Sequence, residues 1–289
     1  LDRIKSLIPG EVLQAIIEGS QQFFDEMRQH GVDIEFMGGE TADVGDVVRT
    51  IAVNGTMGAR WRKNRLITNE KIASGNVIVG LASFGKAVYE KEYNSGIGSN
   101  GLTSARHDVL KKWYAQNFPE TFESSLSDEV VYIGKHDMTD TIDVSFRNET
   151  FKTNIGKLIL SPTRTFAPVV KVMLEQHFQD INGLIHCSGG GQTKCMKYMP
   201  ESVRVVKDNL FAAPEIFNII QQSSGADDKE MYQVFNMGCR LEIYTNEKAA
   251  GALIKLAQEF EIDAQVIGRV EASEKNELIV TANGQRIVY

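Results

Sequence analysis

The apolar residues of this chain change their spacing many times along its length, and this alternation restricts the possible folds more than any other feature. In residues 9–31 the apolar side chains recur at helical spacing, with Pro9 near the start and Gly31 at the end. Residues 75–85 instead form a short, continuous apolar run that ends in small residues, which is typical of a buried strand. Similar switches continue to the C-terminus without a repeat or a low-complexity segment. The sequence therefore predicts a mixed fold of the α/β or α+β class.

The same patterns give a coarse assignment of elements. We expect helices within residues 9–31, 100–116, 161–177, 192–199, 214–222 and 246–260. We expect strands within residues 32–40, 46–59, 75–85, 183–187, 232–245, 263–270 and 276–282. Residues 117–154 are polar and poorly periodic. The polar stretch "TNEKIASG" separates two apolar strand runs, so we place a boundary at 71–74 and expect domains at residues 1–74 and 75–289.

Composition excludes several classes of function. The chain has 289 residues, 42% of them hydrophobic, which is enough for two ordinary domains with well-formed cores. Its net charge of -7 argues against binding to nucleic acid or to an anionic membrane, while a local basic pocket for a phosphorylated small molecule remains allowed. The sequence shows no apolar run of membrane-spanning length and no signal-peptide pattern. Its three cysteines have no CxxC spacing, which indicates neither a disulfide framework nor a zinc site, and we expect a cytoplasmic protein.

Two glycine-bearing segments in the first half of the chain are compatible with anion binding. In "MGGETAD", the glycines let backbone amides approach an anion and Glu40 offers a carboxylate to a hard cation, although an ordinary turn with a solvated glutamate gives the same pattern. In "GIGSNGLTSAR", the start of a helix offers free N–H groups and Arg106 offers a guanidinium. Helix capping alone explains the second segment equally well.

A third segment, "GLIHCSGGGQTKCMKYMP", resembles a nucleotide-binding P-loop only superficially. A P-loop has glycine directly before its lysine and Ser or Thr directly after it, whereas Lys194 follows Thr193 and precedes Cys195. What remains is a strand, three glycines and the start of a helix, an arrangement suited to a phosphate or a polar ring, with His186 and Ser188 as flanking donors. Considered alone, His186 is more often a structural histidine than a catalytic one.

A fourth segment, "EMYQVFNMGCR", interrupts a strand with Asn236 and Gly238. A glycine inside a strand usually marks a bulge or a close approach of two backbones. We therefore interpret this segment as structural.

Taken in order, these segments resemble the aminoimidazole ribonucleotide synthetase family, also called phosphoribosylformylglycinamidine cyclo-ligases. The resemblance rests on the series "GGET", "SNG…AR", "SPTR", "H-x-S-GGG", "P-x-I-F", "EMY…FNMG" and "IGRV", which extends from Gly38 to about Val270. The glycine-rich "HCSGGG" differs from the HD-S-GG sequence of the large amidotransferase-coupled synthetase of the same superfamily. Thiamine-monophosphate kinase and selenophosphate synthetase share the general plan.

The resemblance implies a reaction and a set of partners. ATP would phosphorylate the formamide oxygen of formylglycinamidine ribonucleotide, an amidine nitrogen would close the imidazole ring, and phosphate would leave. Such chemistry depends on Mg²⁺, on loops that hold phosphates and on donors to the reacting amide. The implied partner is a small ribonucleotide, with no nucleic acid and no membrane. The implied architecture is a two-domain homodimer, in which the N-terminal domain contributes strands to a β-barrel at the dimer interface and the C-terminal domain is an α/β sandwich.

The resemblance also assigns roles to residues of this chain. The catalytic residues would be His186 and Asn100, and Glu40 would be the metal ligand. ATP would be held by Gly38, Gly39, Glu40 and Thr41. The substrate side would be lined by Ser99, Asn100, Arg106, Thr163, Ser188, Gly189, Gly190 and Gly191. Thr163 also reads as a helix-start residue.

Three departures from the family pattern stand out. The ATP-binding "DGVGTK" loop is absent, and the chain opens on Leu1, so we expect it to be part of a longer protein. Gly98 stands where the family usually has a histidine before "SNG", after an extra stretch at residues 86–97. Residues 117–154 form a longer region than usual, for which a lid, a dimer contact and a lineage-specific elaboration remain open.

Two alternatives to the cyclo-ligase remain. The departures at Gly98 and in the two longer segments are compatible with an enzyme of the same superfamily that acts on another acceptor, as thiamine-monophosphate kinase and selenophosphate synthetase do. The absent ATP loop is compatible with a non-catalytic module that keeps the fold.

Overall fold

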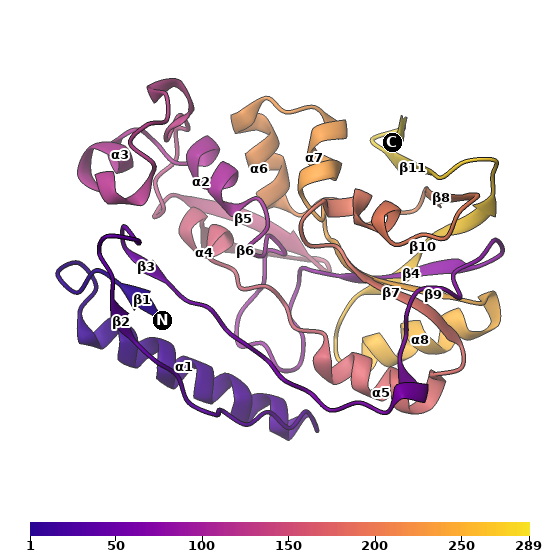
Figure 1. The fold of residues 1–289 in the computed structure, drawn as a ribbon. Coiled ribbons are helices and arrows are strands. Elements are labelled where there is room, and N and C mark those ends of the chain that lie inside the picture. The colour runs from indigo at the N-terminus through magenta and orange to yellow at the C-terminus, as the bar shows by residue number, and fades with distance from the viewer.

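The computed structural model describes all residues from 1 to 289 and has a mixed α/β fold, as the alternating apolar pattern predicts (Figure 1). Its helices are α1 (Gly10–Gln29), α2 (Leu102–Val109), α3 (Trp113–Asn117), α4 (Ile155–Ile159), α5 (Ala167–His177), α6 (Glu215–Ser224), α7 (Asp228–Val234) and α8 (Glu247–Glu259). Short 3₁₀ helices are η1 (Lys63–Arg65), η2 (Pro119–Thr121), η3 (Asp128–Val130) and η4 (Gly191–Lys197). No helix is both long and apolar enough to cross a membrane.

Three sheets account for the strands. The main sheet has seven strands in the order β12 (Gln285–Val288), β11 (Glu277–Ala282), β8 (Val203–Lys207), β10 (Ala264–Ala272), β4 (Val77–Ala82), β9 (Cys239–Thr245) and β7 (Ile181–His186). All its neighbours are antiparallel except β11 and β8. A hairpin pairs β5 (Thr141–Phe146) with β6 (Glu149–Asn154). A small sheet joins three two-residue strands, β1 (Asp2–Arg3), β2 (Ala42–Asp43) and β3 (Ile51–Ala52).

The main sheet carries a hydrophobic core on each face. Helices α5 and α8 cover one face, and α2, α6 and α7 lie on the other (Figure 1). Because successive side chains of a strand point to opposite faces, Leu241 and Ile243 of β9 pack into the α5–α8 core. Glu242 and Tyr244 alternate with them and point to the other face, where the glycine-bearing loops lie.

The N-terminal part is the most open region of the molecule. Helix α1 contributes Met27 to the α5–α8 core, and the chain then returns along α1 and crosses towards α5 (Figure 1). Large apolar side chains of this returning stretch are exposed, among them Met37, Val47, Met57 and Trp61. The strands predicted at 32–40 and 46–59 are largely absent, since only Ile51–Ala52 is a strand there. A strand needs a neighbouring strand to pair its backbone N–H and C=O groups. In this part of the chain only three two-residue strands pair with one another, so longer strands do not form.

Several other predictions need correction. The strand predicted over 232–245 is the end of helix α7 followed by β9, because the Asp227 side chain caps α7 by accepting a bond from the Glu230 amide at 2.8 Å. The helix predicted over 100–116 is split into α2 and α3. The helix predicted at 192–199 is the 3₁₀ helix η4. The poorly periodic region 117–154 contains the β5–β6 hairpin, whose turn residues Arg147 and Asn148 both have positive φ.

Candidate active site

Three loops that are distant in sequence meet at one end of the main sheet. They are residues 96–101 before α2, residues 187–191 after β7, and residues 235–238 before β9. Asn236 joins two of them, because its amide nitrogen donates to the Gly96 carbonyl at 2.8 Å while its oxygen accepts from Ser83 Oγ at 2.7 Å. Asn236 is 2% exposed, which supports the structural interpretation of its segment.

Asn100 connects the first loop to the second. A Cβ atom built on Gly189 would lie 3.4 Å from Asn100 Oδ1, and the Asn100 amide nitrogen donates to the Val234 carbonyl at 2.6 Å. The backbone N–H of Ser99 donates to Thr163 Oγ1 at 3.1 Å. The structure therefore brings together Ser99, Asn100, Thr163 and the glycine-rich loop, as their assignment to one substrate site requires.

The glycines of the second loop are needed by its geometry. Gly190 and Gly191 have φ values of +95° and +47°, a region that glycine adopts far more easily than other residues. A Cβ atom on Gly191 would lie 2.7 Å from the Tyr232 carbonyl oxygen and even nearer to that of Phe235. This loop consequently lies directly against the end of α7, and only glycine permits that approach.

His186 ends β7 directly before the glycine-rich loop, and its pairing with Leu241 places its side chain on the α5–α8 face of the sheet. Its ring remains accessible to solvent and meets the edge of the Phe166 ring with the centroids 6.3 Å apart. Partial burial, followed by the positive charges of Arg240 and Lys194, lowers the pKa of His186 below its usual value of 6.5. The imidazole is therefore neutral near pH 7, and it can donate or accept a hydrogen bond depending on its tautomer.

A buried ionic network contacts the segment that follows the glycine-rich loop, at Gln192. The sequence analysis does not predict this network. Lys207 and Glu242 form an ion pair in which both side chains are 0% exposed. Lys207 Nζ also donates to the Gln192 carbonyl at 2.6 Å, and Glu242 accepts from the Tyr244 hydroxyl at 2.7 Å. The available signal was two charged residues in each of two mainly apolar strands, "VRVVK" and "CRLEIYT", with Lys207 and Glu242 among them.

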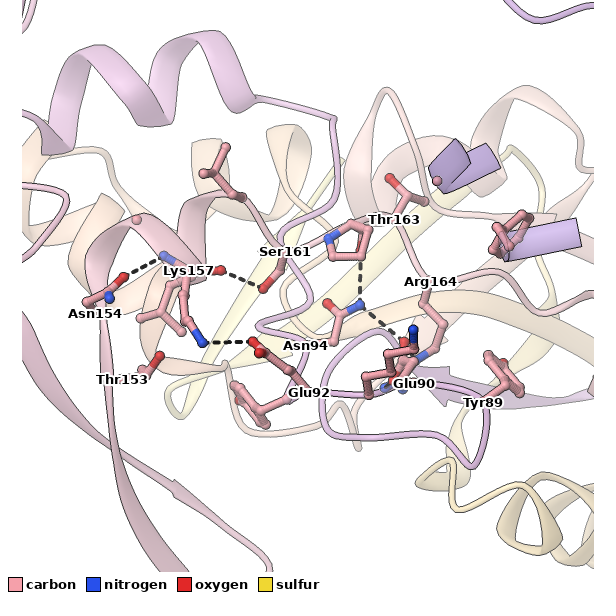
Figure 2. A pocket seen from close by; sticks show the side chains of 18 of the residues that line it. Tyr89, Glu90, Glu92, Asn94, Thr153, Asn154, Lys157, Ser161, Thr163 and Arg164 are labelled. Carbon is pink, nitrogen blue, oxygen red and sulfur yellow. Dashed lines mark hydrogen bonds and ion pairs between the residues drawn. The ribbon is translucent and has the colours of Figure 1, made fainter. Parts of the chain in front are cut away.

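A hollow of about 970 Å³ is lined by Thr163, Arg164 and residues 89–94 among others (Figure 2). Thr163 lines it and also accepts the bond from Ser99, so the hollow and the loop site share this residue. Arg164, whose side chain is 0% exposed, pairs with Glu90 at 2.5 Å and donates to the carbonyls of Ala82 and Phe84. The extra stretch 86–97 thus forms part of the wall, and Arg164 fixes it in place.

Two sets of predicted residues lie elsewhere. No hydrogen bond links the side chains of residues 38–41 to the three loops; the recorded contact is from the Leu1 amino group to the Glu40 carbonyl at 2.8 Å. Arg106 lines a separate hollow of about 720 Å³ with residues 47–51, 120–121 and 123–124, and its guanidinium lies 5.8 Å from the centroid of the Tyr132 ring.

The side chains do not form a complete metal centre. No group of three or more His, Cys, Asp or Glu residues is arranged to hold a metal ion. Glu40 is a single exposed carboxylate, and a Cβ atom on the adjacent Gly38 would meet nothing within 4 Å. Mg²⁺ is commonly bound through one or two carboxylates together with substrate phosphates. The open 38–41 turn fits that sparse mode and not an all-protein cage.

Comparison with known proteins gives consistent sequence relatives. The family described as "AIR synthase related protein, C-terminal domain" matches residues 147–281. The phosphoribosylformylglycinamidine cyclo-ligase of Methanocaldococcus jannaschii is 30% identical over 98% of this chain and 67% of that protein. The corresponding protein of Methanococcus vannielii is 29% identical over 89% of this chain and 63% of that protein. The chain therefore spans about two thirds of the length of these relatives.

Solved structures show weaker similarity. Phosphoribosylformylglycinamidine synthase II from Thermotoga maritima has a TM-score of 0.39 and 11% identity, covering 79% of this chain and 27% of that one. The hydrogenase maturation protein HypE of E. coli has a TM-score of 0.36 and 12% identity, covering 76% of this chain and 51% of that one. Likenesses at these scores carry no weight for function.

Proposed function

The chain belongs to the phosphoribosylformylglycinamidine cyclo-ligase family, and on this premise we propose that the protein containing it closes the imidazole ring of aminoimidazole ribonucleotide in purine biosynthesis. The observation that supports this most directly is the meeting of Asn100, Thr163 and the 188–191 loop at one end of the sheet. These are the residues that the family resemblance assigns to the substrate, and three separate parts of the chain supply them.

The residues of this site suit a reaction that depends on positioning. The neutral His186 ring, the Asn100 amide and the backbone of residues 188–191 offer hydrogen bonds to an amide and to phosphate oxygens. His186 is the proposed contact to the reacting amide. Because its pKa is lowered to about 4, the ring is neutral at pH 7 and its unprotonated nitrogen can accept a hydrogen bond from the attacking nitrogen, although it is a weak base.

ATP, when bound, supplies the phosphoryl group that activates the formamide oxygen. We assign Gly38, Gly39, Glu40 and Thr41 to the ATP side, where Glu40 would share a Mg²⁺ ion with phosphate oxygens. Support comes from the open backbone of this turn and from the single unpaired carboxylate of Glu40. Arg106 remains a proposed substrate residue, although its hollow is separate from that of Thr163.

We further propose that the N-terminal part, residues 1–74, pairs with a second copy of the chain in a cytoplasmic homodimer and contributes strands to a shared barrel. The three two-residue strands of its small sheet have open edges, and Met37, Val47 and Trp61 expose 89%, 82% and 57% of their surface. Exposed apolar patches next to unpaired strand edges are typical of interfaces. Light scattering on the full-length gene product should give twice the protomer mass, whereas a monomer at micromolar concentration would contradict the proposal.

Release of ADP by the full-length gene product tests the reaction. We expect release to depend on formylglycinamidine ribonucleotide and to be lost in His186→Ala. The matched control is His136→Ala, because His136 is a partly exposed histidine outside the three loops. Equal release with thiamine monophosphate or selenide would assign the protein to another member of the superfamily, and absence of ATP binding would indicate a non-catalytic module.

A further inference from the structure

Arg240 stands at an irregularity where β9 begins, next to the last residues of β4. Leu81 of β4 pairs with Leu241, but the next residue, Ala82, pairs with Cys239. Arg240 is therefore the extra residue of a β-bulge, and bulges beside functional sites commonly redirect a side chain. Gly238 does lie close to a bulge, as its position in the sequence predicts.

The redirected side chain is buried without a counter-ion. Arg240 is 1% exposed, and it takes part in no ion pair. Its Nη2 atom donates to the carbonyls of Ile97 at 2.7 Å and Gly96 at 3.2 Å, while its Nε atom has no partner. Burial lowers the pKa of Arg240 to about 10, so the guanidinium remains charged at neutral pH.

This guanidinium fills the space beside Gly98. A Cβ atom built on Gly98 would lie 2.6 Å from Arg240 Cζ and 2.8 Å from Nη1, and still nearer to Nη2. Any side chain at position 98 would collide with Arg240. Gly98 is the position at which this chain departs from the histidine of the family pattern, so the absence of a side chain there and the presence of Arg240 are sterically linked.

We propose that Arg240 is a positioning residue of the ribonucleotide site, which replaces the missing side chain at position 98, holds the 96–101 turn and places a fixed positive charge near His186. The two residues are close in the sheet, because Cys187, which follows His186, donates its backbone N–H to the Arg240 carbonyl at 2.6 Å. This inference rests on the proposed function for the identity of the ligand. An apolar side chain could fill the same space without the cost of burying a charge. A permanent charge is useful where a phosphorylated ligand supplies the compensating anion, and Lys194 is the other cation that acts on His186.

The steric part is tested by a double-mutant cycle on the full-length protein. Gly98→Ala should lower the melting temperature both through the clash with Arg240 and through its positive φ of +61°. In an Arg240→Met background, whose shorter and uncharged side chain is free to move, the same substitution should cost measurably less. Additive effects of the two substitutions would overturn the link between these positions.

The electrostatic part is tested by comparing Arg240→Met with Arg240→Lys. NMR titration of His186 should show its pKa rising towards 6.5 in Arg240→Met and staying near the wild-type value in Arg240→Lys. Affinity for formylglycinamidine ribonucleotide should fall about tenfold in Arg240→Met and recover in Arg240→Lys. If both variants leave the titration and the affinity unchanged, Arg240 acts only as a space filler and the proposal is wrong.

These measurements separate this inference from the proposed reaction. The melting and titration experiments need neither turnover nor substrate. If the wild-type protein fails to bind the ribonucleotide while the titration shift and the Gly98 coupling are observed, the proposed function fails and the link from Arg240 to His186 stands.

Discussion

Replacing Lys207 by methionine removes one partner from the buried ion pair beneath the glycine-rich loop. Both side chains of the Lys207–Glu242 pair are 0% exposed, and methionine keeps most of the lysine volume while losing the charge. Glu242 would keep its bonds from the Tyr244 hydroxyl at 2.7 Å and the Cys187 thiol at 3.2 Å, but without a cation. The carbonyl of Gln192 would lose the donor that now lies at 2.6 Å.

The expected cost is large because the carboxylate left behind is buried. Removing one member of a buried ion pair typically destabilises a protein by about 3–5 kcal/mol. A loss of this size corresponds to a fall in melting temperature on the order of 10 °C for a domain of this size. Lys207→Met combined with Glu242→Gln should cost clearly less than the sum of the two single changes, since neither charge is then left alone.

Thermal unfolding followed by circular dichroism measures these costs. Lys171→Met is the matched control, because Lys171 forms an exposed pair with Glu175 at 2.6 Å on α5, and its loss should cost about 0.5 kcal/mol or less. A Lys207→Met protein that melts within about 2 °C of the wild type would show that the pair contributes little. Such a result would refute the view that it supports the loop.

The remaining predictions concern the loop, the histidine and the hollow. Gly191→Ala should destabilise the protein by about 1–3 kcal/mol in denaturant unfolding because its Cβ atom would meet carbonyl groups at the end of α7, whereas Gly189→Ala, with room for a Cβ, should cost less than about 1 kcal/mol. Because folding lowers the pKa of His186 from 6.5 to about 4, the folded state favours the neutral ring. The contribution of His186 to stability is therefore complete above pH 6.5 and is lost as the pH falls from 6.5 towards 4. Between these two pH values the melting temperature of His186→Gln should depend less on pH than that of the wild type. Arg164→Met removes a fully buried cation and leaves Glu90, whose side chain is 13% exposed, without its ion-pair partner, so it should cost about 3 kcal/mol. Lys157→Met at the exposed rim of the same hollow should cost about 0.5 kcal/mol or less, and thermal unfolding measures both. If Gly191→Ala and Gly189→Ala destabilise the protein equally, or if Arg164→Met and Lys157→Met do, the structural reason given for that pair is wrong. If the melting temperature of His186→Gln depends on pH as strongly as that of the wild type, the reason given for His186 is wrong.

The elements that the sequence predicts well have a local cause. Helices α1, α6 and α8 and strand β4 lie where the apolar spacing places them, because an amphipathic helix or a buried apolar strand is encoded within its own residues. The α7 helix was missed although Asp227, an N-cap residue, precedes it. The β5–β6 hairpin was also missed, although "TIDVSF" and "ETFKTN" are joined at Arg147 and Asn148.

The candidate site was predictable in its parts more than in its assembly. The glycine-bearing segments can be identified in the sequence, and their meeting at one end of the sheet follows from the strand order, which pairs β9 with both β4 and β7. Lys207 and Glu242 lie on two strands that are not neighbours in the sheet, so the charged residues in these strands do not show by themselves that the two form a pair. The location of Arg106 in a separate hollow likewise depends on residues 47–51, 120–121 and 123–124, which are far from it in sequence.

At Gly98 the chain departs from the family pattern, while the fold around the candidate site is kept. From the sequence alone, Gly98 is a missing side chain, and the pattern does not indicate what occupies its space. The structure shows Arg240 in that space, 142 positions away in the sequence, placed there by a bulge in β9. A bulge shifts one residue without altering the pairing of Leu241 and the strand residues after it. The strand can therefore deliver a long cationic side chain to the loop while its apolar face stays in the core. Substitutions at Gly98 and at Arg240 are therefore best tested together, because a side chain at position 98 needs the space that Arg240 occupies.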